Sequence, residues 1–327
     1  MSSEQIDPKT MVEIYRKISL LKQNDERFRS VIRSGRLVMP YYSTRGQEVI
    51  PAAVSVNLEP DDYVCTIYRG IHDSLAKGVP MKMLWAELAG KITGSCKGKG
   101  GPMHITHPAL GVMVTTGIVG SSMPIANGLA LASQIRGDGR VAVANFGDGA
   151  SNIGAFHEAL NLASVWKLPV VFVCQNNRYA EHTKFEVGTS IDQVSKRAAS
   201  YSMPGVTVDG NDPIAMYGAA KEAIDRARRG DGPTLIEAMT FRFHGHVMGD
   251  MDEYMDRDEK TGWVNKDPAP IYRDWLIKQG HASEAQLTEI DSAIAEEINE
   301  ALAFALESPF PDVVEILRDV YEDEVAA

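Results

Sequence analysis

The stretch from Val141 to Tyr179 constrains the fold of this 327-residue chain more than any other. An apolar strand, VAVANF, is followed by Gly147-Asp148-Gly149, and a second apolar strand, VVFVC, runs into Asn176-Asn177. The 26 positions between Gly149 and Asn176, residues 150–175, have room for a loop, a helix and the second strand. This spacing predicts one βαβ unit with two parallel strands.

The ends of these two strands predict a site for a metal ion and a phosphate-bearing ligand. Open α/β sheets bind ligands at the carboxyl ends of parallel strands, so we expect oxygens of Asp148 and Asn177 to meet there. Such oxygens suit Mg²⁺, which takes few protein ligands and bridges them to phosphates. The glycines beside Asp148 let the backbone approach a diphosphate, and a helix predicted to begin near Ser151 directs amide groups toward it.

Composition excludes several classes of protein. The 33 basic and 44 acidic residues give a net charge of −11, which argues against a nucleic-acid surface. No run of eighteen apolar residues occurs, and the start, MSSEQIDPKT, lacks the features of a signal peptide, so we expect a cytoplasmic protein without a membrane partner. The three cysteines have no CxxC spacing, and Cys65 and Cys174 are predicted to be buried free thiols.

Helical and strand patterns alternate along the chain, as in α/β proteins. We predict a single domain, residues 1–327, built on a doubly wound, mostly parallel sheet. It has an N-terminal helix (about 9–34) and a C-terminal helical extension (about 270–327). Residues 246–268, rich in Asp, Met and Gly, are predicted to form a mobile loop. The other expected elements are helices over 46–58, 80–92, 125–135, 214–229 and 283–308, and strands over 61–68 and 234–241.

The motif of a strand, GDG, 26 residues and NN resembles the signature of thiamine diphosphate enzymes. The longer text GDGASNIGAFHEALNLASVWKLPVVFVCQNNRYA, with KGKGGPMH at 97–104, is similar to the alpha subunit of the 2-oxo acid dehydrogenase first component. This family acts on pyruvate, branched-chain 2-oxo acids or acetoin, and the resemblance extends from about residue 10 to 310. It implies the diphosphate-binding half of a thiamine diphosphate fold, with Mg²⁺ as the second cofactor.

The resemblance also assigns roles to individual residues. It places Mg²⁺ on Asp148, Asn177 and Tyr179, while Gly149 and Ala150 belong to the cofactor site. Tyr68 and Arg69 follow the strand VCTI, and the family places a matching pair on the diphosphate, where a guanidinium fits phosphate in fork geometry. Gly117 and Val119 begin and end a Gly-Ile-Val segment that in relatives holds the aminopyrimidine through backbone groups.

The histidines need separate consideration. The family counterpart of RFHGH at 242–246 uses the Arg and the second His near the diphosphate and the reacting carbon, so Arg242 is a cofactor residue and His246 the catalytic one. A histidine that titrates near neutrality can move a proton in acyl transfer. His244 is expected to support it; the alternative, a His-x-His metal pair, lacks a third ligand at suitable spacing. His157 is predicted to be a core residue, and the role of His104 stays open.

A partner chain is implied as well. In related enzymes, a glutamate from a second domain protonates the aminopyrimidine, and this chain has room only for the diphosphate half. The resemblance therefore implies a beta subunit in an α2β2 assembly, which passes the acyl group to a lipoyl-bearing dihydrolipoyl acyltransferase. The small-molecule donor is a 2-oxo acid or acetoin.

The donor itself stays open at the level of sequence. Tyr42 stands where relatives that use pyruvate commonly have a histidine, and Ile71 stands where they often have another, with His72 one position later. Two other classes are alternatives: a transketolase-like half subunit that transfers ketol groups, and a noncatalytic magnesium-nucleotide module. The first predicts clustered sugar-phosphate anchors and the second a GxGxxG with a ribose-binding acid, and neither pattern is found.

Overall fold

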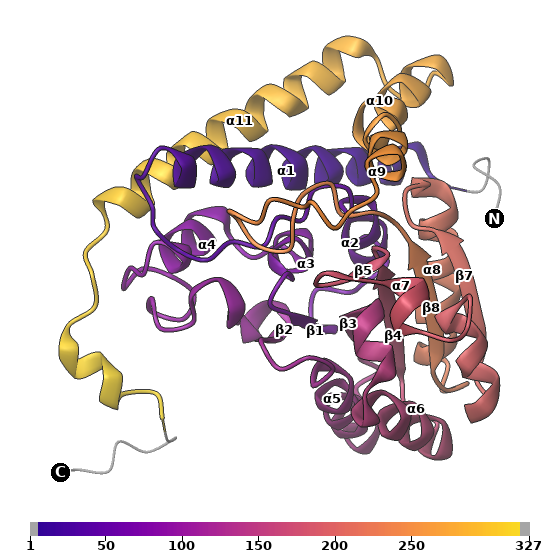
Figure 1. Ribbon diagram of the computed structural model, residues 1–327. Coiled ribbons are helices and arrows are strands. Elements are labelled where there is room, and N and C mark those ends of the chain that lie inside the picture. Colours follow the sequence, from indigo (N-terminus) through magenta and orange to yellow (C-terminus); the bar gives the residue numbers. More distant parts are fainter. Residues whose placement is uncertain (1–5, 321–327) are drawn as a thin grey trace.

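The protein, described here by a computed structural model over residues 6–320, is built on one six-stranded sheet with helices on both faces (Figure 1). All strand pairs of this sheet are parallel, in the order β2-β1-β3-β4-β8-β7. The predicted doubly wound α/β fold is therefore confirmed. The strands are β1 Tyr63–Ile67, β2 Val112–Thr116, β3 Ala142–Gly147, β4 Val170–Asn176, β7 Gly205–Asp209 and β8 Thr234–Met239.

Alternate side chains of the central strands enter two different cores. Val143 and Val171 belong to the core that also contains side chains of α1, α2 and α8, whereas Ala144 and Phe172 belong to the core with α5 and α6. Because both faces of the sheet are buried, the sequences of these strands are continuous runs of apolar residues. The helices of these two layers are α1 Pro8–Arg33, α2 Val49–Ser55, α5 Ser122–Arg136, α6 Gly154–Trp166 and α8 Pro213–Arg228.

The terminal helices form a layer at the top of the view in Figure 1. The long helix α1 begins at an Asp7 cap with Pro8 in its first turn, and it contacts α11 (Glu284–Glu307) through Asp291. The Asp291 carboxylate accepts hydrogen bonds from the hydroxyls of Tyr15 (2.8 Å) and Ser19 (2.6 Å). Beyond α11 the chain descends past α4 (Met81–Leu88) toward η6 (Val313–Leu317).

Most predicted helices and strands occur within a few residues of their expected bounds, and three local predictions were wrong. The stretch 246–268, predicted to be loop throughout, contains α9 (Arg257–Val264), and α10 (Pro268–Lys278) follows it. The helix expected near Ser151 begins at Gly154, after the 3₁₀ turn η4 (Asp148–Asn152). His157 is exposed rather than in the core, while Cys65 and Cys174 are buried as predicted.

Short elements were not predicted. Among them are β2, β7, helix α3 (Ile71–Lys77), helix α7 (Phe185–Gly188) and the hairpin of β5 (Tyr179–Ala180) with β6 (Thr183–Lys184). No helix within residues 6–320 is long and apolar enough to cross a membrane. Residues 321–327, the end of the predicted C-terminal extension, lie outside the described part of the chain.

Candidate active site

A cavity of about 380 Å³ opens at the carboxyl ends of β1, β3, β4 and β8. All of the sequence-predicted site residues line it, although they come from five separate stretches of the chain. The structure thus brings together every residue predicted to bind the cofactor or the metal or to be catalytic, whereas His244, expected to support His246, does not line the cavity. The residues brought together are Tyr68, Arg69, Gly117, Val119, Asp148, Gly149, Ala150, Asn177, Tyr179, Arg242 and His246.

Asp148 supplies a buried carboxylate at the end of β3. The residue is 2% exposed, and its Oδ2 atom has no hydrogen-bond partner among the described residues. Burial raises the pKa of this carboxyl group from 3.8 to about 6. A buried carboxylate oxygen without a partner is costly for a folded protein, and coordination of a metal ion is one reason for keeping one.

Asn177 and Tyr179 present oxygens to the same cavity. The Asn177 side chain donates from Nδ2 to Oε1 of Gln47 at 2.7 Å, which fixes the amide, and its Oδ1 accepts from the Tyr179 N–H at 3.3 Å. The Tyr179 ring packs in a cluster with Phe241, and its hydroxyl accepts from the Asp256 N–H at 3.3 Å. The phenol is thus engaged, and the main-chain carbonyl is the Tyr179 oxygen left for a ligand.

Hairpin geometry supports this choice of atom. The Phe185 N–H donates to the Arg178 carbonyl at 2.8 Å, and Tyr179 pairs with Lys184 at the next position of the hairpin. Antiparallel ladders alternate between hydrogen-bonded and non-hydrogen-bonded pairs, so the backbone groups of Tyr179 point away from the ladder.

Arg69 and Arg242 place two guanidinium groups in the wall of the cavity. Arg69 is 3% exposed and donates to the carbonyls of Ser43 (2.8 Å) and His246 (3.0 Å). Arg242 is 1% exposed and donates to the carbonyls of His244 and Glu181 and to the Tyr254 hydroxyl. None of these partners is a carboxylate. Burial and the neighbouring Arg242 charge lower the pKa of Arg69 to about 10.

His246 lies between the two guanidinium groups. Its Nδ1 is 3.4 Å from Arg69 Nη2 and 3.5 Å from Arg242 Nη1, so Nδ1 accepts and the proton of the neutral ring is on Nε2. Burial and these two cations lower the pKa of His246 from 6.5 to about 4. The imidazole is therefore neutral at pH 7, and its pKa lies below the near-neutral range of an ordinary histidine.

The neutral histidines predict how stability depends on pH. The pKa of His244 is lowered to about 3 by burial and nearby cations, and that of His246 to about 4. Below about pH 6.5 the unfolded chain binds protons that the folded chain does not bind. The stability that the two neutral histidines contribute is therefore present in full above pH 6.5 and is lost as pH falls toward 4. Each proton adds at most about 1.4 kcal/mol per pH unit to the slope. We expect His244→Gln to reduce the slope in urea titrations from pH 7 to 5; an unchanged slope would contradict the prediction.

The segment after His246 is tied to the site by one carboxylate. Asp250 accepts hydrogen bonds from the His246 N–H (2.6 Å), the Tyr254 hydroxyl (2.8 Å) and the Asp252 N–H (3.1 Å). These bonds lower the pKa of Asp250 to about 2. Because Tyr254 also accepts from Arg242, the loop and a cavity guanidinium are held by the same hydroxyl.

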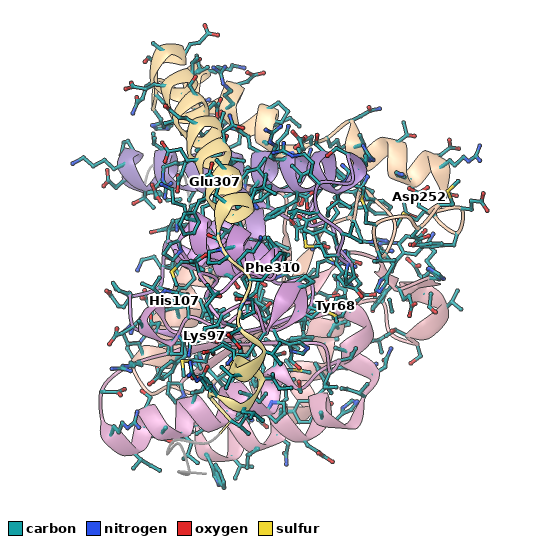
Figure 2. All side chains as sticks on the ribbon, turned by 90° about the vertical axis from the view of Figure 1, so that its left-hand side faces the viewer. Tyr68, Lys97, His107, Asp252, Glu307 and Phe310 are labelled. Carbon is teal, nitrogen blue, oxygen red and sulfur yellow. The ribbon has the colours of Figure 1, made fainter. Side chains whose placement is uncertain are left out.

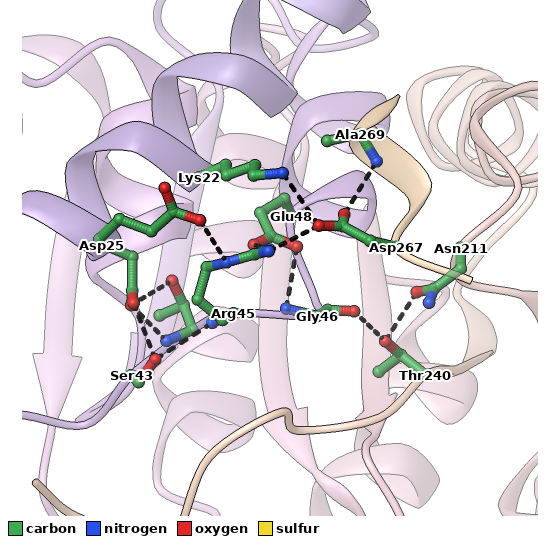
Figure 3. A network of polar contacts seen from close by, with 12 residues as sticks. Lys22, Asp25, Ser43, Arg45, Gly46, Glu48, Asn211, Thr240, Asp267 and Ala269 are labelled. Carbon is green, nitrogen blue, oxygen red and sulfur yellow. Dashed lines mark hydrogen bonds and ion pairs between the residues drawn. The ribbon is translucent and has the colours of Figure 1, made fainter. Parts of the chain in front are cut away.

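A polar network around Arg45 supports the segment 41–48 (Figure 3). Tyr42 and Gln47 of this segment line the cavity. Arg45 forms ion pairs with Glu48 and Asp267, and the Gly46 N–H donates to Glu48 Oε2 at 3.0 Å. Gly46 has φ +97°, and a Cβ there would stand 2.1 Å from the Phe241 carbonyl oxygen, so only glycine fits. The network fixes the position of Gln47 and hence of the Asn177 amide.

Sequence reasoning assigned no role to several residues that line the cavity. Gln175 directly precedes the Asn-Asn pair, and Gln47 lies in the Gly-Gln-Glu motif, so neighbouring motifs could have indicated that both residues belong to the site. The glycine-rich segment could have indicated Met103 in the same way, whereas no motif near Glu181 indicated a role for it. His104, whose role was left open, lies beside Gly117 rather than among the lining residues.

The fold and the cavity define a class of proteins: α/β proteins that bind an anionic, phosphate-bearing cofactor at the carboxyl edge of a parallel sheet. Comparison with known families makes the class specific. Residues 16–314 match the family model described as "Dehydrogenase E1 component". The chain belongs to this family, which confirms the predicted resemblance and the prediction of a thiamine diphosphate-dependent oxidoreductase.

Individual relatives are similar over most of their length. The alpha subunit of acetoin:2,6-dichlorophenolindophenol oxidoreductase from Bacillus subtilis (strain 168) is 41% identical over 94% of this chain and 92% of the relative. The protein of that name from Cupriavidus necator is 39% identical over 97% and 95%. The pyruvate dehydrogenase E1 component subunit alpha of Porphyra purpurea is 39% identical over 85% and 83%. The family match decides against the two alternative classes.

Proposed function

We propose that this chain binds the diphosphate and Mg²⁺ of thiamine diphosphate as the alpha subunit of an E1 enzyme that uses acetoin or a 2-oxo acid. One observation carries the proposal. Arg69 and Arg242, two buried guanidinium groups with no carboxylate partner within residues 6–320, share a cavity with Asp148, whose Oδ2 has no partner in the same range. A diphosphate with its Mg²⁺ is complementary to this set, because the anion pairs with the cations and the metal with the carboxylate.

The donor atoms suit Mg²⁺ better than a transition metal. Within residues 6–320 no group of three His, Cys, Asp or Glu side chains is placed to hold a metal. The proposed ligands are the Asp148 carboxylate, the Asn177 amide oxygen and the Tyr179 carbonyl, all hard oxygens. Mg²⁺ favours such a set and completes its shell with water and phosphate oxygens.

The residues of this chain bind and orient, while bound thiamine diphosphate supplies the carbanion chemistry. Arg69 and Arg242 hold the diphosphate, and Gly149 allows close backbone approach. His246 keeps a proton on Nε2 at neutral pH, so that it can donate a hydrogen bond to a developing oxyanion. Tyr42 and Tyr68 contact the His246 ring, with centroids 5.4 and 5.7 Å away, and fix its plane.

Charge in the cavity favours acetoin over a 2-oxo acid as the donor. Arg69 and Arg242 are the only Lys or Arg side chains among the lining residues, and the diphosphate would pair with both. His246 is neutral, so the described residues that line the cavity offer no further cation for a substrate carboxylate. A neutral hydroxyketone needs none, and two of the most similar relatives are named for acetoin.

A beta subunit and a lipoyl-bearing acyltransferase are the proposed partners, in an α2β2 enzyme. The relatives are named as alpha subunits. At the mouth of the cavity Ile118 and Val119 are 70% and 50% exposed, as expected of a site that a second chain completes.

The test is reconstitution. We would co-express the chain with the adjacent beta-like reading frame and follow dichlorophenolindophenol reduction with acetoin, pyruvate and branched-chain 2-oxo acids. Turnover that requires thiamine diphosphate and Mg²⁺, with acetoin preferred and the isolated chain inactive, is the expected result. Preference for a 2-oxo acid would overturn the donor assignment only. A stable heteromer that binds no thiamine diphosphate would overturn the proposed function.

A further inference from the structure

Glu87 is a buried carboxylate that accepts hydrogen bonds from four backbone amides of one loop. It lies in the last turn of α4 and is fully buried. Its Oε2 accepts from the N–H groups of Cys96 (2.7 Å) and Gly98 (2.9 Å). Its Oε1 accepts from those of Gly100 (2.7 Å) and Gly101 (3.0 Å). Within residues 6–320 no cation forms an ion pair with it, so the loop amides are its partners.

The backbone of this loop is shaped around the carboxylate. Lys97, Gly98 and Gly101 have φ of +56°, +77° and +58°, and such left-handed positions turn successive N–H groups to one side, as in an anion-binding nest. A Cβ on Gly94 would stand 2.4 Å from Glu87 Oε2, and one on Gly98 would stand 2.6 Å from the Gly90 carbonyl carbon. The glycines thus permit the close approach that the four hydrogen bonds require.

The far end of the loop reaches the cofactor cavity. Met103 lines the cavity, and its Sδ lies 3.9 Å from the point where a Cβ of Gly117 would stand. The His104 ring lies 3.7 Å from the same point. Gly117 is one of the residues expected to hold the cofactor through its backbone, so the loop packs next to a segment of the proposed cofactor site.

The outer side of the loop is held by the C-terminal segment that descends past Phe310 (Figure 2). Lys97 and Lys99 form ion pairs with the Asp319 carboxylate, at 2.9 and 2.5 Å. These pairs are exposed and contribute little rigidity. The buried Glu87 carboxylate, which accepts from four loop amides, constrains the loop more than these exposed pairs do.

We infer that Glu87 is a positioning residue for the cofactor site: it fixes the loop 96–104, which sets the position of Met103 and of the Gly117 backbone. This inference rests on the proposed function, because it concerns the affinity for thiamine diphosphate. Glutamine at this position has one acceptor oxygen, and its NH₂ group would face two N–H donors. Altering residues that orient the ligands of a metal site typically changes metal affinity or activity about 10- to 100-fold, and we expect an effect of this order on cofactor affinity here.

The experiment compares Glu87→Gln with Asp62→Asn in the reconstituted enzyme. Asp62 is an equally buried carboxylate at the opposite end of the sheet, where it pairs with Arg228. We expect Glu87→Gln to raise the Kd and the KM for thiamine diphosphate with Mg²⁺ about 10-fold or more. The kcat at saturating cofactor should stay close to that of wild type, and trypsin should cleave faster at Lys97 and Lys99. Asp62→Asn should lower Tm without changing Kd, KM or cleavage at these lysines.

A purely structural role for Glu87 predicts a different pattern. It would lower Tm and the active fraction, and hence kcat, while Kd and KM stayed at wild-type values, and this result would overturn the inference. If Glu87→Gln does not fold, Gly98→Ala decides, because it distorts the same loop and keeps the carboxylate; unchanged cofactor affinity would again overturn the inference. A wild-type enzyme that binds no thiamine diphosphate would instead contradict the proposed function.

Discussion

Replacing Asp148 by asparagine should make the cofactor-free protein more stable and remove its affinity for Mg²⁺ and thiamine diphosphate. The carboxylate is buried, and within residues 6–320 its Oδ2 has no hydrogen-bond partner, so at pH 7 the folded state carries a charge that is only partly compensated. The rise of its pKa from 3.8 to about 6 corresponds to a gain of up to about 3 kcal/mol in the free energy of unfolding. Removing one partner of a buried charge pair costs about 3–5 kcal/mol, so cofactor affinity should fall by at least about 100-fold.

The pH dependence of this gain has a definite sign. Because the folded-state pKa of Asp148 is raised, the folded protein binds more protons than the unfolded chain between pH 3.8 and about 6. The wild type therefore carries the full cost above pH 6 and loses it as pH falls toward 4. The stability gain of Asp148→Asn, measured by urea denaturation without cofactor, should be largest above pH 6 and vanish near pH 4.

Asp250→Asn is the matched control. This carboxylate accepts three hydrogen bonds, and its pKa is lowered to about 2. Its contribution to stability is present above pH 3.8, so the substitution should destabilise the protein at pH 7. If Asp148→Asn were to destabilise the cofactor-free protein as Asp250→Asn does, Asp148 would be a structural carboxylate and the argument for a metal ligand would fail.

How far the sequence predicts this site depends on where each side chain stands. Asp148 and Asn177 follow long apolar strands, so parallel pairing alone brought them to one edge of the sheet. Arg69 and Arg242 could be placed there only through the family motifs, because the local sequence around a single Arg after a strand does not indicate what its side chain contacts. Their effect on His246 could not be predicted, since its low pKa depends on two guanidinium groups that lie 177 and 4 residues away in the chain.

The errors in the fold have physical causes as well. The 3₁₀ turn Asp148–Asn152 replaces the expected first helical turn, because Gly147 and Ile153 on either side of it are extended. Helix α9 lies in a stretch with few aliphatic residues and has no fully buried side chain, so apolar periodicity could not reveal it. Glu87 carried no motif of its own, and only the folded loop shows that four amides converge on it.

The second large effect should come from Arg242→Met. This substitution should weaken the binding of Mg²⁺-pyrophosphate, which serves as a probe for the diphosphate, by about 100-fold or more. The reason is that charge-assisted hydrogen bonds contribute about 1.5–3 kcal/mol each. The same change should raise the pKa of His246 from about 4 toward 6.5, since the Arg242 cation helps to lower it. Arg242→Lys separates the two effects. Lysine keeps the charge but not the guanidinium fork, so calorimetry should show weakened pyrophosphate binding while NMR titration shows a His246 pKa still near 4. If Arg242→Met bound pyrophosphate as tightly as wild type, the two buried guanidinium groups would not form the diphosphate site.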